Sequence, residues 1–384
     1  MRKWDTLLRA GMLAFLVSAL AAGAGGAAQA SKPSEGTLAA PPAVTTTDSA
    51  EVRKAFEGLL ITGAGVSWKP RARRQNTIVR VPFTKQNGLI IVQATLGGKA
   101  LSCVLDTGDP LVRWPRRLRL AGKATGIRAQ GTDAGGHGEA HEMVVLSQVR
   151  IGGYELANVP SWAVGTPDDA APDAGDADAP ETLAGGVWRR YPVLGNVVFE
   201  QVALTIDYRR SELILRPKSA NAAATQRVPG TRTLPVQRVG PVFTTDTGTA
   251  RGGFLVFAGS VNGQPVNFLL DTGLPFAPGI VLAPGKRALL GDAPASSGQE
   301  VRAVTGLGQV SAQRFTDVSW LLGGVPGKGE VIVPPQLATL GDDKTSIDAL
   351  VGAYLLQAYR ITIDYPRSRV LLEPYAATEA AATR

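Results

Sequence analysis

Cysteine and histidine are nearly absent from this chain of 384 residues, which contains one cysteine and two histidines. A single cysteine excludes an internal disulfide framework. Aromatic residues make up only 6% of the chain, whereas glycine and proline number 45 and 26. Many turn-forming residues and few large side chains favour short strands over long helices. The length is sufficient for two domains, each with its own core.

The formal net charge is +8, but the sequence lacks the pattern typical of nucleic-acid binding. Basic residues are scattered along the chain and do not alternate with aromatic residues, which indicates a solvated surface. We therefore expect no nucleic-acid partner. After the first 30 residues, no run is long and apolar enough to span a membrane.

Residues 1–30 have the features of a secretory signal peptide. Arg2 and Lys3 are followed by the apolar run Leu13–Leu20, and Ala28-Gln-Ala30 is a typical cleavage site. The alternative is an uncleaved membrane anchor, although alanine and glycine in the second half of the run partition poorly into lipid. We predict cleavage, a mature N-terminus close to Ser31, and a periplasmic or secreted protein without further membrane contact.

Two stretches of the chain repeat each other around an Asp-Thr-Gly sequence. An apolar strand leads into Asp106-Thr107-Gly108 and another leads into Asp271-Thr272-Gly273. Gly88 precedes the first aspartate by 18 residues, and Gly253 precedes the second by 18. A hairpin dipeptide, Gly97-Gly98 or Asn262-Gly263, falls at the same offset in each copy.

The repeat continues downstream with a second motif. Val193-Leu194-Gly195 precedes Thr205-Ile-Asp207-Tyr208, and Leu350-Val351-Gly352 precedes Thr362-Ile-Asp364-Tyr365. The glycine and the threonine are separated by 10 residues in both copies. Matched spacing over two motifs indicates an internal duplication.

These motifs resemble the retropepsin/pepsin clan of aspartic proteases, and the downstream tails resemble its bacterial retropepsin-like branch. The resemblance covers about Gly88–Pro217 and Gly253–Pro374. It implies an all-β fold of two closed barrels in a pepsin-like bilobal arrangement, with both half-sites in one monomer. The expected segments are a signal peptide (1–30), a flexible segment that could be a pro-segment (31–76), lobe one (77–217), a linker (218–232), lobe two (233–375) and a disordered tail (376–384).

The resemblance implies that Asp106 and Asp271 are the catalytic pair. Two carboxylates about 3 Å apart cannot both ionise, so they share a proton and activate a water molecule held between them. Thr107, Gly108, Thr272 and Gly273 are expected to support the pair. The predicted function is that of an exported aspartic endopeptidase acting on peptides or unfolded proteins, without cofactor or metal.

The residue after each Asp-Thr-Gly departs from the family pattern, in which a small residue is usual. Asp109 would add a third negative charge and raise the pKa values of the pair, and Leu274 would narrow the cleft. This departure leaves open an alternative function, a catalytically inactive module that binds a peptide or protein by β-addition.

Several residues resemble functional groups but are predicted to have structural roles. Asp246-Thr247-Gly248 is expected to form a turn, Cys103 to be a buried apolar residue, and Asp207 and Asp364 to shape turns between strands. His137, Glu139 and His141 alternate and could chelate a metal ion, but the second copy has no counterpart, so no metal site is predicted. They belong to the first of two predicted flaps, Lys123–Glu142 and Ala303–Val310.

Overall fold

The predicted signal peptide, pro-segment, linker and tail fall largely outside the residues that the computed structural model describes. The described ranges are 18–20, 59–62, 65–68, 71–72, 77–86, 88–132, 138–165, 190–217, 228–239, 242–245, 248–251, 253–274, 279–291, 295–304, 309–335 and 346–375.

Six strands of the first repeat close into a barrel. Strand β6 pairs with both β7 and β10, so the ring runs β6-β7-β12-β8-β11-β10 and returns to β6. A seventh strand, β9, forms an antiparallel hairpin with β10. The strands are β6 (Leu89–Leu96), β7 (Lys99–Leu105), β8 (Val112–Pro115), β9 (Gly122–Thr132), β10 (Gly138–Ile151), β11 (Tyr154–Val164) and β12 (Val193–Leu194).

The second repeat closes in the same way. Strand β19 pairs with both β20 and β23, and the ring runs β19-β20-β25-β21-β24-β23. Strand β22 forms a hairpin with β23, as β9 does with β10. The strands are β19 (Phe254–Val261), β20 (Gln264–Asp271), β21 (Gly279–Leu282), β22 (Ala295–Val304), β23 (Gln309–Leu322), β24 (Val325–Val333) and β25 (Ala349–Gly352).

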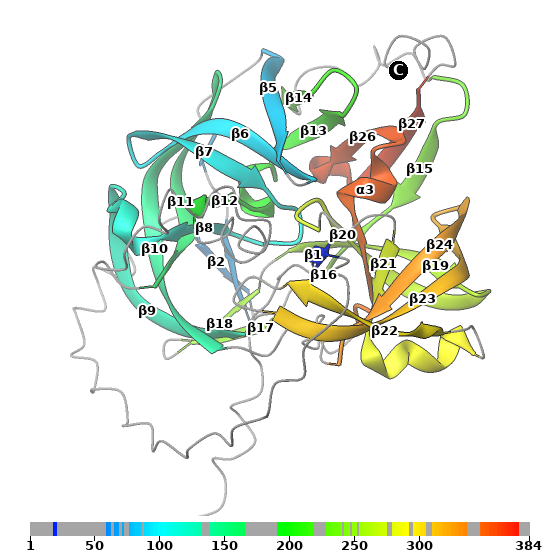
Figure 1. Ribbon diagram of the computed structural model, residues 1–384. Helices are drawn as coiled ribbons and strands as arrows, with labels where there is room; N and C mark the ends of the chain where they lie inside the picture. The colour runs from blue at the N-terminus through cyan, green and yellow to red at the C-terminus, as the bar shows by residue number, and fades with distance from the viewer. Residues whose placement is uncertain are drawn as a thin grey trace, which may run out of the picture.

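The two rings use corresponding strands in the same order, which confirms the predicted all-β fold of two closed barrels related by internal duplication. Closure leaves few exposed strand edges within each barrel. The predicted flaps lie in or next to the hairpins β9–β10 and β22–β23. Figure 1 shows the barrel of lobe one on the left and that of lobe two at the lower right.

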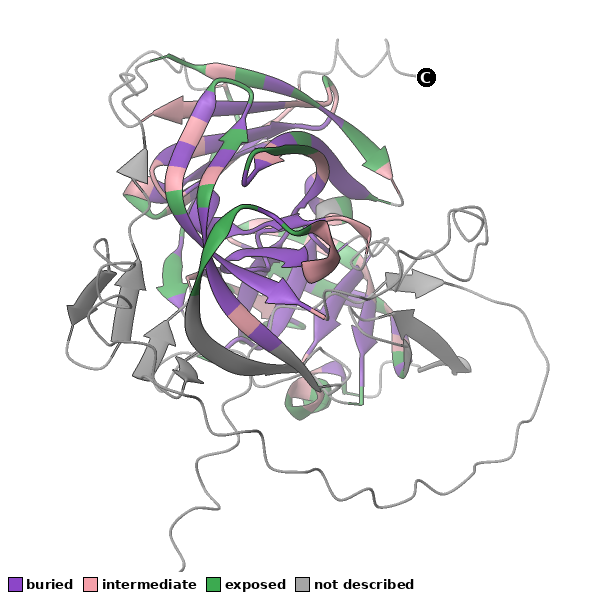
Figure 2. Ribbon diagram, turned by 90° about the vertical axis from the view of Figure 1, so that its left-hand side faces the viewer, coloured by how far each residue is buried: buried purple, intermediate pink, exposed green. Residues whose placement is uncertain are grey.

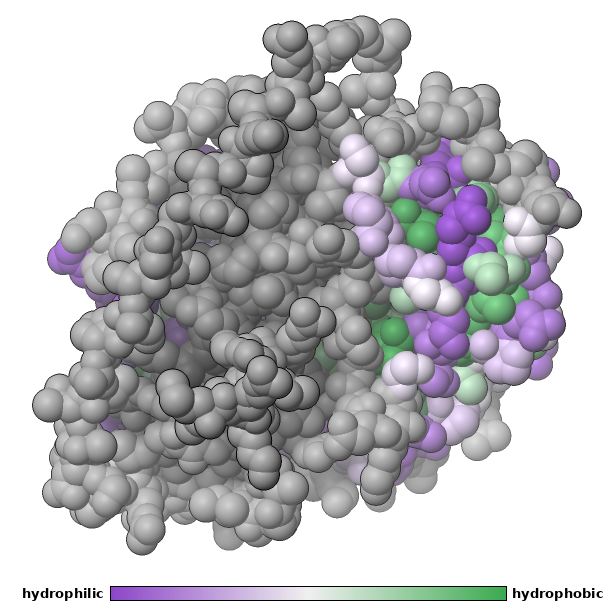
Figure 3. All heavy atoms as spheres, turned by 90° about the horizontal axis from the view of Figure 1, so that it is seen from below, coloured by the Kyte–Doolittle hydropathy of each residue, from purple (hydrophilic) through white to green (hydrophobic). Residues whose placement is uncertain are grey.

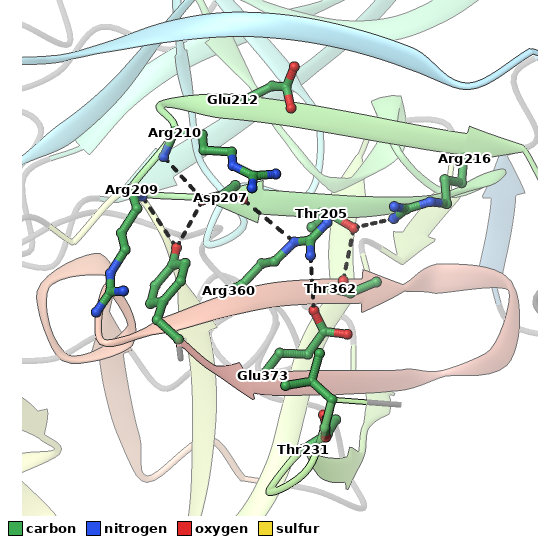
Figure 4. Close-up of polar contacts among 12 residues, drawn as sticks. Thr205, Asp207, Arg209, Arg210, Glu212, Arg216, Thr231, Arg360, Thr362 and Glu373 are labelled. Atoms are coloured by element: carbon green, nitrogen blue, oxygen red, sulfur yellow. Dashed lines mark hydrogen bonds and ion pairs between the residues drawn. The ribbon is translucent and has the colours of Figure 1, made fainter. Parts of the chain in front are cut away.

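A six-stranded sheet joins the lobes, in the order β15-β27-β26-β13-β14-β5. Its strands are β5 (Val79–Gln86), β13 (Val202–Asp207), β14 (Glu212–Pro217), β15 (Arg232–Pro235), β26 (Tyr359–Asp364) and β27 (Arg369–Pro374). At its centre, Thr205 pairs directly with Thr362, and their hydroxyls are 2.8 Å apart (Figure 4). Arg216 Nη1 donates to the same Thr205 hydroxyl at 2.8 Å. These contacts fix the two repeats to each other about a pseudo-twofold axis.

Short elements complete the chain. A small sheet, β17-β18-β3-β2, pairs the N-terminal segment with the start of the second repeat. Strand β1, inside the predicted signal peptide, pairs with β22, and β4 pairs with β11. The remaining strands are β1 (Ser18–Leu20), β2 (Leu59–Thr62), β3 (Gly65–Trp68), β4 (Arg71–Ala72), β16 (Gln237–Val239), β17 (Val242–Thr245) and β18 (Gly248–Arg251). The short helices are η1 (Arg116–Leu118), η3 (Asn196–Val198), η5 (Pro284–Leu290), α3 (Ala353–Leu356) and η6 (Tyr365–Arg367).

Buried residues follow the barrel strands of both lobes (Figure 2). Among the described residues, the exposed large apolar side chains are the scattered Ile78, Leu321 and Tyr354. The described residues visible from below mix hydrophilic and hydrophobic side chains without a single apolar patch (Figure 3). No helix in the described ranges has the length and apolarity needed to cross a membrane.

The threonine pair at the centre of the joining sheet generates a stability prediction. Thr205→Val removes the hydroxyl that Arg216 and Thr362 share, which leaves buried polar atoms unsatisfied and should lower the free energy of unfolding by about 1–3 kcal/mol. Urea denaturation measures this change. Thr233→Val, at an exposed position of β15, is the matched control and should change stability by less than about 0.5 kcal/mol. Equal effects of the two substitutions would contradict a specific role for the central pair.

Candidate active site

Each Asp-Thr-Gly loop follows a buried strand at the pseudo-twofold axis. Strand β7 ends one residue before Asp106, and β20 ends on Asp271. The apolar-apolar-Gly strands β12 and β25 lie parallel beside them, and the Asp106 N–H donates to Leu194 O at 3.1 Å. The structure thus brings both predicted aspartates together, and they are 0% and 1% exposed.

The threonines of the two loops form reciprocal hydrogen bonds across the axis. The Thr107 N–H donates to Thr272 Oγ1 at 3.0 Å, and the Thr272 N–H donates to Thr107 Oγ1 at 3.0 Å. Each hydroxyl in turn donates across the axis, Thr107 to Leu270 O at 2.8 Å and Thr272 to Leu105 O at 3.1 Å. Four buried hydrogen bonds therefore hold the loops in one relative position.

The two glycines allow the close approach of each loop to the opposite carboxyl group. A Cβ atom on Gly108 would lie 2.5 Å from Cγ of Asp271, and one on Gly273 would lie 2.3 Å from Cγ of Asp106. Neither position has space for a side chain. The glycine N–H groups also donate to their own aspartates, Gly108 to Asp106 Oδ1 at 2.7 Å and Gly273 to Asp271 Oδ1 at 2.9 Å.

The electrostatics of the pair favour one shared proton. Burial raises the pKa of Asp106 well above its ordinary value, and the charges of Asp271 and Asp109 raise it further, while Arg113 lowers it. Burial also raises the pKa of Asp271. This pKa rises only to about 6, because hydrogen bonds from Asp106 and the Gly273 N–H partly compensate for burial. Burial and mutual repulsion therefore favour a state in which the pair retains one proton and titrates as a unit.

Asp109 lies in a buried ion pair. Its Oδ2 is 3.1 Å from Nε of Arg113, and its Oδ1 accepts from the Leu111 N–H at 3.1 Å. Both charged residues are 4% exposed. The charge of Asp109 acts on the pair in the predicted direction, since it raises the pKa values of both Asp106 and Asp271, but Arg113 opposes it at Asp106.

Leu274 has a different position from the one expected for a residue that narrows a cleft. Its side chain is 0% exposed and belongs to the apolar core. A Cβ atom on Gly352 would lie 3.0 Å from its Cβ and Cγ atoms, so the side chain packs on the strand that carries the apolar-apolar-Gly motif.

The other candidate residues have varied positions. Cys103 is 0% exposed in β7, and burial raises the pKa of its thiol. Asp207 accepts from the Arg210 N–H at 3.1 Å within a turn, and Asp364 forms ion pairs with Arg367 and Arg369. His141 is buried in β10 with its ring 5.9 Å from that of Trp162.

Three of the predicted positions lie outside what the structure describes. His137 is not in the described ranges, and no side-chain placement is described for Glu139. Asp246 also lies outside them, but the strands before and after it, β17 and β18, pair as an antiparallel hairpin. Within the described ranges, no group of three His, Cys, Asp or Glu residues could hold a metal ion.

Two polar residues at the site were not predicted from the sequence. Arg113 follows Asp109 by four residues, a spacing that does not by itself predict an ion pair. Asn196 follows Gly195, and its side chain donates to Thr107 O at 2.8 Å. A difference between the repeats could have indicated Asn196, because the corresponding residue after Gly352 is Ala353.

No family model matches the chain, and no curated protein matches it in sequence. Among solved structures, the chain is similar to an aspartic proteinase from Irpex lacteus, with 12% sequence identity and a TM-score of 0.43 over 80% of this chain and 100% of that chain. The function proposed below therefore rests on the geometry of the site.

The buried ion pair generates a stability prediction. Arg113→Met leaves the Asp109 carboxylate without its cationic partner and should lower the free energy of unfolding by about 3–5 kcal/mol. The double substitution Asp109→Leu/Arg113→Met removes both charges and should be more stable than the single one. Urea denaturation of the variants tests this. A double variant that is less stable than Arg113→Met would contradict the pairing.

Proposed function

We propose that this chain is an exported aspartic endopeptidase that uses Asp106 and Asp271 to hydrolyse peptide bonds. The observation that carries the proposal is the pair of Asp-Thr-Gly loops, held together by reciprocal threonine hydrogen bonds. The pair shares a proton, as general acid–base catalysis of hydrolysis by two carboxyl groups requires. The signal-like N-terminus supports export, and peptides or unfolded proteins are the proposed substrates.

One carboxyl group of the pair acts as the base and the other as the acid, and we propose Asp271 as the base. Ionised Asp271 takes a proton from a water molecule as the water oxygen attacks the peptide carbonyl carbon. Asp106 gives its proton to the carbonyl oxygen, which forms a neutral tetrahedral diol. Asp271 then protonates the amide nitrogen, the C–N bond breaks, and a diol hydroxyl returns its proton to Asp106. One water molecule is consumed, and the pair regains its initial state.

A second candidate is the binding module that holds an extended peptide without cutting it. The near-complete burial of both aspartates favours this candidate, because water and substrate have to reach them. Incubation of the protein with an unfolded protein mixture, with and without a statine-type transition-state mimic, separates the two. Cleavage that the mimic inhibits supports the peptidase, and peptide binding without cleavage supports the module.

Substitution of the aspartates provides a sharper test. Asp106→Asn and Asp271→Asn should each abolish cleavage, because the remaining carboxyl group cannot act as both acid and base. The double variant should be no worse than either single one, since the residues act as a unit. Peptide-cleavage assays measure this, and substantial activity in one single variant would contradict the shared pair.

The raised pKa values predict how activity and stability depend on pH. Activity should fall as pH falls below about 6, because Asp271 has to be ionised. The folded pKa exceeds the unfolded one, so the contribution of Asp271 to stability is complete below its unfolded pKa and is lost as pH rises through about 6. Rate and melting-temperature profiles measure both effects. Asp271→Asn should remove this part of the stability change, and an unaltered profile in that variant would contradict the assignment.

A further inference from the structure

Asn196 makes three buried hydrogen bonds with its side-chain amide beside the first aspartate loop. Its Nδ2 donates to Thr107 O at 2.8 Å and to Gly253 O at 2.9 Å. Its Oδ1 accepts from the Tyr365 hydroxyl at 2.7 Å. The residue is 1% exposed, so these contacts use both amide hydrogens and the amide oxygen of a group that is shielded from water.

Asn196 is also fixed through its backbone. Its N–H donates to Asp109 O at 2.8 Å, and the preceding Gly195 has no space for a side chain, since a Cβ atom there would lie 2.4 Å from the same carbonyl oxygen. The main chain at Asn196 therefore lies directly against the loop that follows Asp106. This contact places the amide within reach of the Thr107 carbonyl.

The bond to Thr107 O connects Asn196 to the catalytic pair through one peptide group. The Thr107 carbonyl and the Gly108 N–H belong to the same peptide unit, and that N–H donates to Asp106 Oδ1 at 2.7 Å. Hydrogen bonds in a chain polarise one another. Donation from Asn196 to the carbonyl therefore strengthens donation from the N–H to Asp106.

Tyr365 forms the other end of this chain of hydrogen bonds and is packed against neighbouring side chains. It is 3% exposed, its ring stacks on that of Phe199 with centroids 6.4 Å apart, and the Arg238 guanidinium lies 5.7 Å from its centroid. Burial raises the pKa of Tyr365, and the charges of Glu200 and Asp106 add to this rise while Arg238 opposes it. The hydroxyl consequently remains protonated and acts as a donor.

The second repeat lacks this chain of hydrogen bonds. Ala353 occupies the position that corresponds to Asn196 and has no amide group. The corresponding tyrosine, Tyr208, is buried at 5% exposure, and its hydroxyl has no hydrogen-bond partner within the described part of the chain. The duplication therefore carries a hydrogen-bond chain to only one of its two aspartates.

We propose that Asn196 and Tyr365 are positioning residues, which orient the Thr107–Gly108 peptide group and strengthen its hydrogen bond to Asp106, a support that the second repeat does not give to Asp271. Donation to the carboxylate favours its ionised form. Like Arg113, this chain of hydrogen bonds lowers the pKa of Asp106, whereas burial and the charges of Asp271 and Asp109 raise it. It thus keeps the Asp106 proton available for transfer. The rate effect rests on the proposed peptidase function, whereas the effect on Asp106 titration does not.

The experiment compares two tyrosine-to-phenylalanine substitutions in the full chain. Tyr365→Phe removes the hydroxyl that donates to Asn196 and keeps the stacked ring. Tyr208→Phe removes the hydroxyl from the corresponding tyrosine of the other repeat and serves as the matched control. The carboxyl carbons of ¹³C-labelled aspartates are followed by NMR across pH without substrate, and Asp106→Asn identifies the Asp106 signal.

Loss of the Tyr365 hydroxyl should raise the titration midpoint of Asp106 by about half a pH unit, and Tyr208→Phe should leave it unchanged. In cleavage assays, Tyr365→Phe should lower kcat about threefold or more with little change in KM. Asn196→Ala should produce larger changes in the same direction. If that variant does not fold, Tyr365→Phe decides alone.

An Asp106 titration in Tyr365→Phe that coincides with that of the unsubstituted chain would overturn the proposal. An equal shift in Tyr208→Phe would do the same, because it would show a general effect of deleting a buried hydroxyl. If the unsubstituted protein cleaves no peptide, the proposed function fails. The titration still decides whether the chain of hydrogen bonds acts on Asp106.

Discussion

The reciprocal hydrogen bonds between Thr107 and Thr272 are the interaction on which the rest of the structure depends. Each threonine uses its hydroxyl as acceptor and donor for backbone groups of the other repeat. These backbone groups lie at or next to the ends of β7 and β20, where burial excludes water. Because all four hydrogen bonds cross the axis, one repeat alone cannot form the site. The joining sheet, with Thr205 against Thr362, holds the lobes where the four bonds can form.

The second constraint is the burial of three carboxyl groups in one small volume. An isolated buried charge is costly, and each carboxylate here has compensating partners. Asp109 has Arg113 and a backbone N–H, while Asp106 and Asp271 share a proton and accept from the N–H groups of Gly108 and Gly273. The resulting pKa values depend on a balance in which burial is the largest contribution. Such a balance makes the site sensitive to the loss of any one partner.

The sequence predicted most of the symmetric features of the molecule. Equal spacing between the motifs was sufficient for the two closed barrels and for the placement of both aspartates at one axis, because a duplicated strand order closes in the same way twice. The asymmetric features were not predicted. Asp109 was expected beside the pair without a partner, because a charge pattern does not reveal which cation shares its buried site. Leu274 was expected to narrow a cleft, but an apolar residue next to a buried strand is more stable inside the core. Asn196 could have been found from its mismatch with Ala353.

The polar features that differ between the repeats lie at the first aspartate. The Asp109–Arg113 ion pair and the chain from Tyr365 through Asn196 both act near Asp106, and the second repeat has Leu274 and Ala353 at the corresponding positions. Two carboxyl groups in identical surroundings would hold a shared proton equally well. A reaction that needs one acid and one base at defined positions proceeds from a single arrangement of that proton. Divergence between the repeats supplies the difference in environment that duplication alone would have removed, while the threonine hydrogen bonds keep the geometry symmetric.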